Sequence, residues 1–126
     1  MPMTPMELVA QARAQITEVS PKDAWDAMSG DVRVLDVRET SEFEAGRLPG
    51  AINIPRGILE FRIGEVQEFA RKDVPILLYC RTGGRAALAT VALNQLGYSN
   101  VRSITGGVMG WEQAGLPVEK DRTNYF

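Results

Sequence analysis

Apolar and polar residues alternate along the chain in short segments that predict strands and helices in turn. The segment 32–37 (VRVLDV) predicts a buried strand, and the continuous apolar run 74–79 (VPILLY) predicts a central strand covered on both faces. Shorter strands are predicted over 16–20, 50–55 and 100–104. Strands of this kind separated by helices predict an α/β fold, a central parallel sheet of about five strands flanked by helices on both faces.

Helices are predicted between these strands, and two of them carry clear start signals. Thr4, Pro5 and Glu7 form a capping pattern before a helix near the N-terminus, and Ser20 begins a similar pattern before PKDAWDAM. The strongest helix is the alanine-rich segment that begins at Gly84. Further helices are predicted over 40–46, 106–115 and 57–72, where Gly64 is expected to bend or break the last one.

The length and composition are typical of one globular domain. The chain has 126 residues, of which 44% are hydrophobic and 24% charged. We expect a helical extension over 1–15, the domain over 16–118 and a tail over 119–126. Leu8 and Ala12 fall on one face of the first helix, which predicts that the extension packs on the domain.

Charge and residue counts exclude several classes of function. The net charge of -2 gives no basic field for nucleic acid or for an anionic membrane surface. No basic leader and no long apolar run is seen, so we expect a cytoplasmic protein. One cysteine and no histidine exclude an intramolecular disulfide, the usual zinc sites and a cysteine–histidine pair, and we expect no metal and no cofactor.

The only cysteine, Cys80, follows the apolar run 74–79, where a loop leads into the strongest helix. In parallel α/β sheets, ligands bind at such carboxyl ends of strands. The residues that follow the cysteine are Arg81, Thr82, Gly83, Gly84 and Arg85. The glycines let consecutive N–H groups curl toward one point, at which the next helix also begins. We expect these groups and the arginines to bind an anion and to favour a Cys80 thiolate.

An inert interpretation of Cys80 has to be weighed against this one. A lone cysteine at the end of an apolar strand is, as a type, more often a small core residue than a nucleophile. A glycine pair with flanking arginines has little structural purpose at a buried position, so CRTGGR favours function.

Three blocks of sequence together resemble the rhodanese family of sulfurtransferases in its single-domain form. They are VLDVRETSEFEAGRLPGAINIP, YCRTGGRA and ITGGVMGWEQAGLPV, and the resemblance spans residues 16–118. It implies a parallel sheet flanked by helices and a Cys80 that carries a sulfane sulfur as a persulfide. It also implies a small anionic donor such as thiosulfate, and a thiol, cyanide or partner protein as the acceptor. Many members have GHIPGA where this chain has GRLPGA, which adds a positive charge at Arg47.

Two other functions stay open on these residues. The chain could be a non-catalytic rhodanese-like module for protein interaction or regulation. It could also be a phosphatase or an arsenate reductase, but cysteine phosphatases use a loop one residue longer to encircle a phosphate. Here only Arg81 to Gly84 separate Cys80 from Arg85, and the shorter ring suits a single sulfur atom.

The remaining candidates lie outside the loop. Asp36 and Arg38 are expected to be structural, as an ion pair or network near the site that can include Glu42. Arg56 begins the segment after the strand over 50–55. In the resemblance this segment borders the active-site mouth, so Arg56 is expected to help bind an anionic donor. The alternative is a solvated surface arginine. Trp25 and Trp111 are expected in the core.

Overall fold

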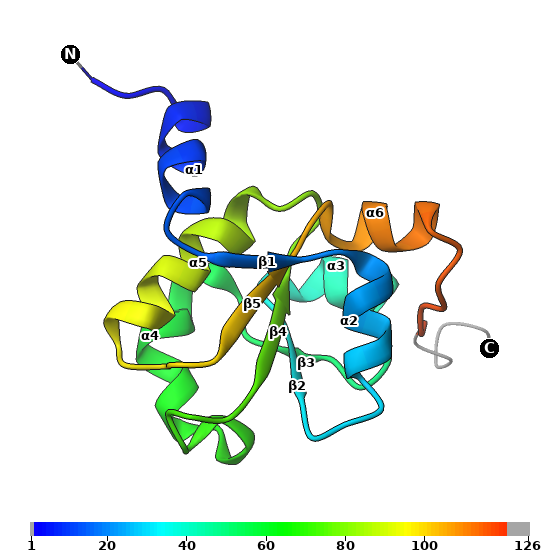
Figure 1. The fold of residues 1–126 in the computed structure, drawn as a ribbon. Helices are drawn as coiled ribbons and strands as arrows, with labels where there is room; N and C mark the ends of the chain where they lie inside the picture. The colour runs from blue at the N-terminus through cyan, green and yellow to red at the C-terminus, as the bar shows by residue number, and fades with distance from the viewer. Residues whose placement is uncertain (1, 121–126) are drawn as a thin grey trace.

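The computed structural model describes residues 2–120, which form a parallel sheet between two layers of helices (Figure 1). The strands are β1 (Thr17–Val19), β2 (Arg33–Asp36), β3 (Ile52–Asn53), β4 (Ile76–Tyr79) and β5 (Val101–Ile104). They lie in the order β1-β5-β4-β2-β3, and every neighbouring pair is parallel. Strand β4 is therefore central, as the run 74–79 predicted. Of the predicted tail, residues 121–126 lie outside the described part of the chain.

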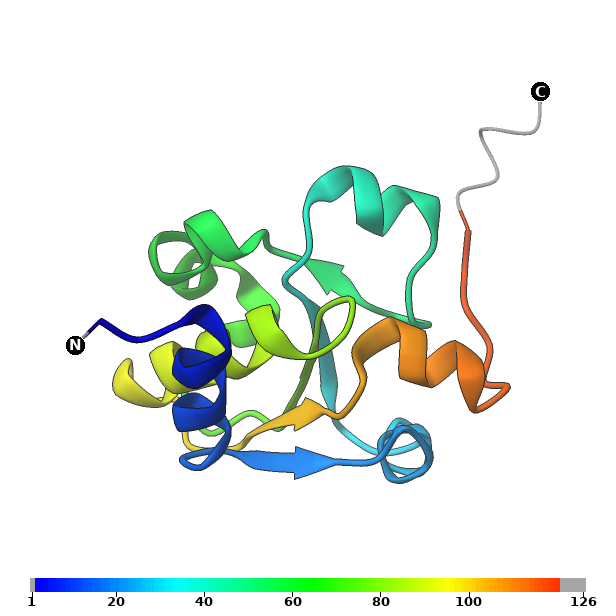
Figure 2. The same cartoon turned by 90° about the horizontal axis from the view of Figure 1, so that it is seen from above.

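The helices cover both faces of the sheet, and the predicted fold class is confirmed. They are α1 (Pro5–Arg13), α2 (Pro21–Ala27), α3 (Thr40–Ala45), α4 (Leu59–Arg62), α5 (Gly84–Gln95) and α6 (Gly107–Gln113), with short 3-10 turns η1 (Arg56–Ile58), η2 (Ile63–Glu65) and η3 (Gln67–Phe69). Figure 2 shows α1, α4 and α5 on one side of the sheet and α2 and α6 on the other. No helix within residues 2–120 combines the length and the apolar character of a membrane span.

Strand β4 contributes to a separate hydrophobic core on each face of the sheet. Ile76 and Leu78 pack with the residues under α4 and α5, while Leu77 and Tyr79 pack with those under α2 and α6. All four side chains are fully buried. Because alternate residues of a strand point to opposite faces, apolar side chains at all four positions of β4 supply both cores.

Helix α5 packs on the sheet through small side chains and on α1 through larger ones. Ala86 and Ala89 are fully buried in the core, so the helix lies close to the strands. Leu88 and Val91 lie instead along a groove shared with α1. Ala12 of α1 is 4% exposed, so the extension packs on the domain as predicted.

Two expectations about local structure need adjustment. Trp111 is fully buried, but Trp25 is 40% exposed, so its placement in the core was wrong. Trp25 of α2 meets Trp111 of α6 edge to face, with 5.8 Å between the ring centroids. The segment 57–72 is broken, as Gly64 predicted, but into short turns after only one turn of α4.

Candidate active site

The Cys80 loop (residues 80–85) connects the central strand β4 to α5 and folds around the cysteine sulfur. Gly83 takes a φ of +121°, which a residue with a side chain rarely adopts, and this conformation allows α5 to begin at Gly84. The N–H of Gly83 donates to Cys80 Sγ at 3.1 Å and that of Ala86 at 3.3 Å. Cys80 is only 1% exposed and belongs to the hydrophobic core cluster under α4 and α5, so the two N–H groups meet a buried sulfur.

The first turn of α6 holds the Cys80 loop in place. Val108 N–H donates to the Cys80 carbonyl at 2.9 Å, and Met109 N–H donates to the Arg81 carbonyl at 3.1 Å. Gly107 lies between the two segments at a φ of +58°, and a Cβ there would lie 2.5 Å from the carbonyl carbon of Arg81. The sequence predicted a helix over 106–115 and contributed this segment to the family resemblance, but Gly107 was given no role at the site.

A buried network fixes the ends of β2 and β4 beside the loop. Arg38 Nη2 donates to Asp36 Oδ2 at 2.7 Å, and the Tyr79 hydroxyl donates to the same oxygen at 2.6 Å. Burial, followed by the Asp36 carboxylate, raises the pKa of Tyr79, so the phenol stays protonated and keeps its donor role. Arg38 also donates to the Gly46 carbonyl at 2.6 Å, which extends the network to the end of α3. These contacts fit the structural role expected for Asp36 and Arg38.

Glu42 of α3 binds Arg85 instead of joining the Asp36 network. Arg85 donates from Nη1 and Nη2 to the two carboxylate oxygens at 2.8 and 3.0 Å, a bidentate pair. These hydrogen bonds from Arg85 lower the pKa of Glu42 to about 2. The sequence analysis identified both residues but did not pair them. The guanidinium of Arg85 is therefore engaged with α3 at the rim of the loop.

The other two candidate cations have different surroundings. Arg81 and Thr82 are exposed on the loop, and within residues 2–120 Arg81 forms no ion pair. Arg56 pairs with Glu60 at 2.8 Å and lines the groove between α1 and α5. Arg81 and Arg85 thus belong to the Cys80 loop itself, whereas Arg56 lies in a neighbouring groove.

Replacing Glu42 with glutamine is expected to lower the free energy of unfolding by about 0.5–1 kcal/mol near neutral pH, because the pair is partly exposed. The pKa of Glu42 is about 2 in the folded chain against 4.5 ordinarily. The carboxylate therefore stabilises the fold above pH 4.5, and this contribution is lost as the pH falls toward 2. Urea unfolding of both proteins between about pH 6 and about pH 3 should show the difference shrinking with acid. A difference that is independent of pH would contradict the ion pair.

Comparison with known proteins identifies the family. The sequence profile of the Rhodanese-like domain matches residues 20–114. The thiosulfate sulfurtransferase GlpE of Actinobacillus succinogenes is 36% identical over 104 residues, which cover 82% of this chain and 90% of that protein. The chain belongs to the rhodanese-like domain family and has sulfurtransferases among its relatives.

Solved structures agree with this assignment of the fold. A rhodanese-related protein from Thermoplasma volcanium superposes with a TM-score of 0.74 and 30% identity, over 83% of this chain and 99% of that one. A protein of unknown function from Rhodopseudomonas palustris, described as a possible tyrosine phosphatase, superposes with a TM-score of 0.79 and 31% identity, over 94% of this chain and 99% of the other. The rhodanese fold is thus shared with proteins for which different chemistry has been suggested.

Proposed function

We propose that the protein is a sulfurtransferase in which Cys80 takes a sulfane sulfur from thiosulfate or a similar anionic donor and passes it to a thiol or cyanide. The two N–H groups aimed at Sγ at 3.1 and 3.3 Å support this most strongly. Main-chain donors directed at a sulfur stabilise negative charge on it, both as a thiolate and as a persulfide. The kinship with thiosulfate sulfurtransferase GlpE points to the same chemistry.

The first half-reaction needs only the cysteine and an anionic donor. The Cys80 thiolate attacks the outer sulfur of thiosulfate, a new sulfur–sulfur bond forms, and the old one breaks with its electron pair leaving on sulfite. In the second half-reaction, the acceptor attacks the outer sulfur of the persulfide and the Cys80 thiolate is restored. One cysteine is sufficient because no resolving thiol takes part.

The residues around the loop have separate roles in this proposal. Gly83 and Gly84 give the backbone the shape that directs N–H groups inward, and Arg81 and Thr82 bind the sulfite portion of the donor from the exposed side. Arg85 adds positive charge at the rim of the loop, where Glu42 fixes the position of its guanidinium. Arg56, which lies in the adjacent groove, attracts the anionic donor toward the site. A reduced Cys80 is needed for each cycle, which suits the cytoplasm, and the acceptor can be a partner protein.

A phosphatase activity is the second candidate, because the structure from Rhodopseudomonas palustris carries that suggestion. Two observations favour sulfur transfer over it. The loop has four residues between Cys80 and Arg85, and Glu42 binds both terminal nitrogens of Arg85. An arginine held in this way lacks the free fork that would grip a phosphate.

Incubation of the protein with thiosulfate and cyanide is expected to release thiocyanate catalytically, whereas an aryl phosphate is expected to stay intact. Thiocyanate is measured as its coloured iron complex and the aryl alcohol by its absorbance. Hydrolysis of the phosphate without any thiocyanate would replace the proposed function with the second candidate. If the protein neither forms thiocyanate nor hydrolyses the phosphate, a non-catalytic role in protein interaction or regulation is favoured.

A further inference from the structure

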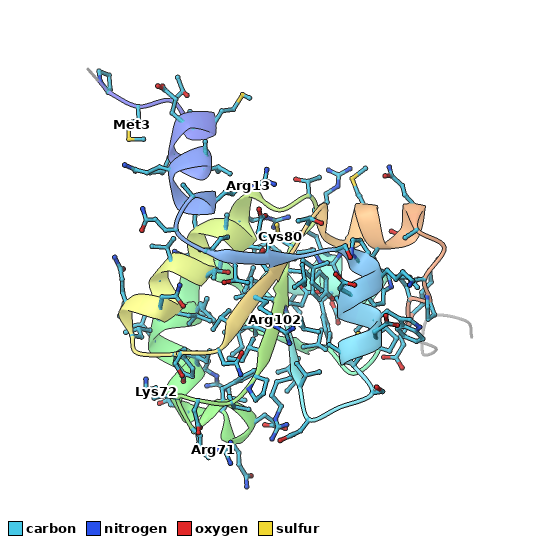
Figure 3. The ribbon with its side chains drawn as sticks, in the orientation of Figure 1. Met3, Arg13, Arg71, Lys72, Cys80 and Arg102 are labelled. Carbon is cyan, nitrogen blue, oxygen red and sulfur yellow. The ribbon has the colours of Figure 1, made fainter. Side chains whose placement is uncertain are left out.

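A cavity of about 210 Å³ lies between α3 and α6, and Cys80 is not among the residues that line it. Figure 2 shows α3 and α6 on the side of the Cys80 loop away from α1. In Figure 3, Cys80 lies at the upper end of the sheet, beside the point from which α6 extends. Cavities for drug-sized ligands have volumes of about 300–1,000 Å³, so this one suits a smaller molecule.

One wall of the cavity carries a buried guanidinium with an unused nitrogen. The side chain of Arg38 is 6% exposed, and its Nε and Nη2 donate to Asp36 and to the Gly46 carbonyl. Within residues 2–120, the enclosed side-chain atoms without a partner are Arg102 Nε and Ser103 Oγ. Arg38 Nη1 also forms no hydrogen bond in this part of the chain, but it is not enclosed. Because Arg38 lines the cavity, this donor is available to a ligand there.

The segment after α6 closes the cavity and brings Lys120 to it. Arg47 and Glu119 exchange two main-chain hydrogen bonds of 2.9 and 2.7 Å, which fix this segment beside the end of α3. Lys120 Cγ lies 3.9 Å from the position of a Cβ on Gly46, the residue whose carbonyl accepts from Arg38. Lys120 forms no ion pair in the described part of the chain, so its charge is available to a ligand.

Negative charge and apolar surface complete the lining. Glu112 of α6 is exposed and forms no ion pair with any of residues 2–120. Glu42 has both carboxylate oxygens bound to Arg85, so Glu112 is the acid left for a ligand. Val108 and Val118 add apolar surface to the same space. The cavity therefore offers positive donors, one carboxylate and short aliphatic walls to a small molecule.

We propose that this cavity binds a free α-amino acid with a short aliphatic side chain. The carboxylate of the ligand accepts hydrogen bonds from Arg38 Nη1 and Lys120, and its ammonium pairs with Glu112. Its side chain lies against Val108 and Val118. A simple anion would lie beside the unpaired charge of Glu112, and a simple amine would leave Arg38 Nη1 without an acceptor. The site goes beyond sulfur transfer, because it uses none of the groups assigned to the donor or the persulfide.

The test is a titration of the full chain with three compounds, followed through the amide chemical shift of Val108. They are L-valine, 3-methylbutanoate, which lacks the ammonium, and 2-methylpropylamine, which lacks the carboxylate. We expect L-valine to bind with a Kd of about 1 mM, and both analogues to bind at least about tenfold more weakly. Glu112→Gln and Lys120→Met should each weaken the binding of L-valine about fivefold.

Matched control variants come from exposed residues that do not line the cavity. Glu68→Gln and Lys22→Met make the same chemical changes, and neither residue forms an ion pair within residues 2–120. Both should change the Kd for L-valine less than about twofold. Glu112→Gln should also leave the weak binding of 3-methylbutanoate no weaker than in the wild type, because that compound has no ammonium to lose its partner.

The outcomes decide between this site and simpler ones. Binding of L-valine that is tighter than that of both analogues, and that Glu112→Gln and Lys120→Met weaken more than the controls do, supports the amino-acid site. No saturable shift with L-valine overturns the inference. Equal binding of L-valine and 3-methylbutanoate also overturns it, since the cavity would then be a site for simple anions. Release of thiocyanate from thiosulfate and cyanide is measured separately, and its failure affects the proposed function alone.

Discussion

Replacing Cys80 with serine is expected to reduce thiocyanate formation from thiosulfate and cyanide at least about a thousandfold, to the uncatalysed background. A serine hydroxyl at this position can still accept from the N–H groups of Gly83 and Ala86, which lie 3.1 and 3.3 Å from the sulfur. It has no sulfur to extend, so no persulfide can form. The proposed chemistry is removed while the shape of the loop is retained.

The serine variant has to remain folded for this loss to be informative. Cys80 and serine are close in size, and we expect the free energy of unfolding in urea to change by less than about 2 kcal/mol. Retention of more than about a tenth of the wild-type rate by a folded serine variant would contradict Cys80 as the sulfur carrier.

Among substitutions outside the Cys80 loop, Gly107→Ala is expected to disturb the conformation of the loop most. A Cβ at this position would lie 2.5 Å from the carbonyl carbon and oxygen of Arg81, and these backbone atoms cannot turn aside as a flexible side chain can. The φ of +58° adds strain of about 1–2 kcal/mol for a residue with a side chain. We expect a loss of at least about 3 kcal/mol of stability and a fall of more than about tenfold in sulfur transfer, because the Cys80 loop must move.

Gly115→Ala provides the matched control for this variant. Gly115 has a similar φ of +76°, but nothing lies within 4 Å of the added Cβ, so the substitution introduces strain without a clash. Its cost should stay near 1 kcal/mol, with sulfur transfer unchanged. Equal losses of stability and activity in the two variants, measured by urea unfolding and thiocyanate release, would show that the contact between Gly107 and the Cys80 loop is unimportant.

The order of strands and helices could be predicted because burial leaves a direct trace in the sequence. The run 74–79 has no polar position since β4 is covered on both faces, and helix caps identified the starts of α1 and α2. The segment 57–72 was harder to predict. Leu59, Ile63 and Phe69 are buried as their spacing indicated, but the spacing does not separate one bent helix from short 3-10 turns.

The candidate site could be predicted where its residues are close in sequence. The Cys80 loop is a local feature, since glycine conformation and a helix start within six positions determine where the N–H groups of Gly83 and Ala86 point. The partners of the loop come from distant segments. Glu42 and Arg85 lie 43 positions apart, and Gly107 meets the loop only after β5 has packed beside β4. No pattern in a single sequence states which of several acids an arginine will bind.

The most direct test of the account is the mass of the intact protein after incubation with thiosulfate. The wild type is predicted to gain the mass of one sulfur atom, to lose it again when cyanide is added, and to show no gain when Cys80 is replaced by serine. An unchanged mass in the wild type under conditions in which the protein is folded and its thiol reduced would contradict a persulfide on Cys80.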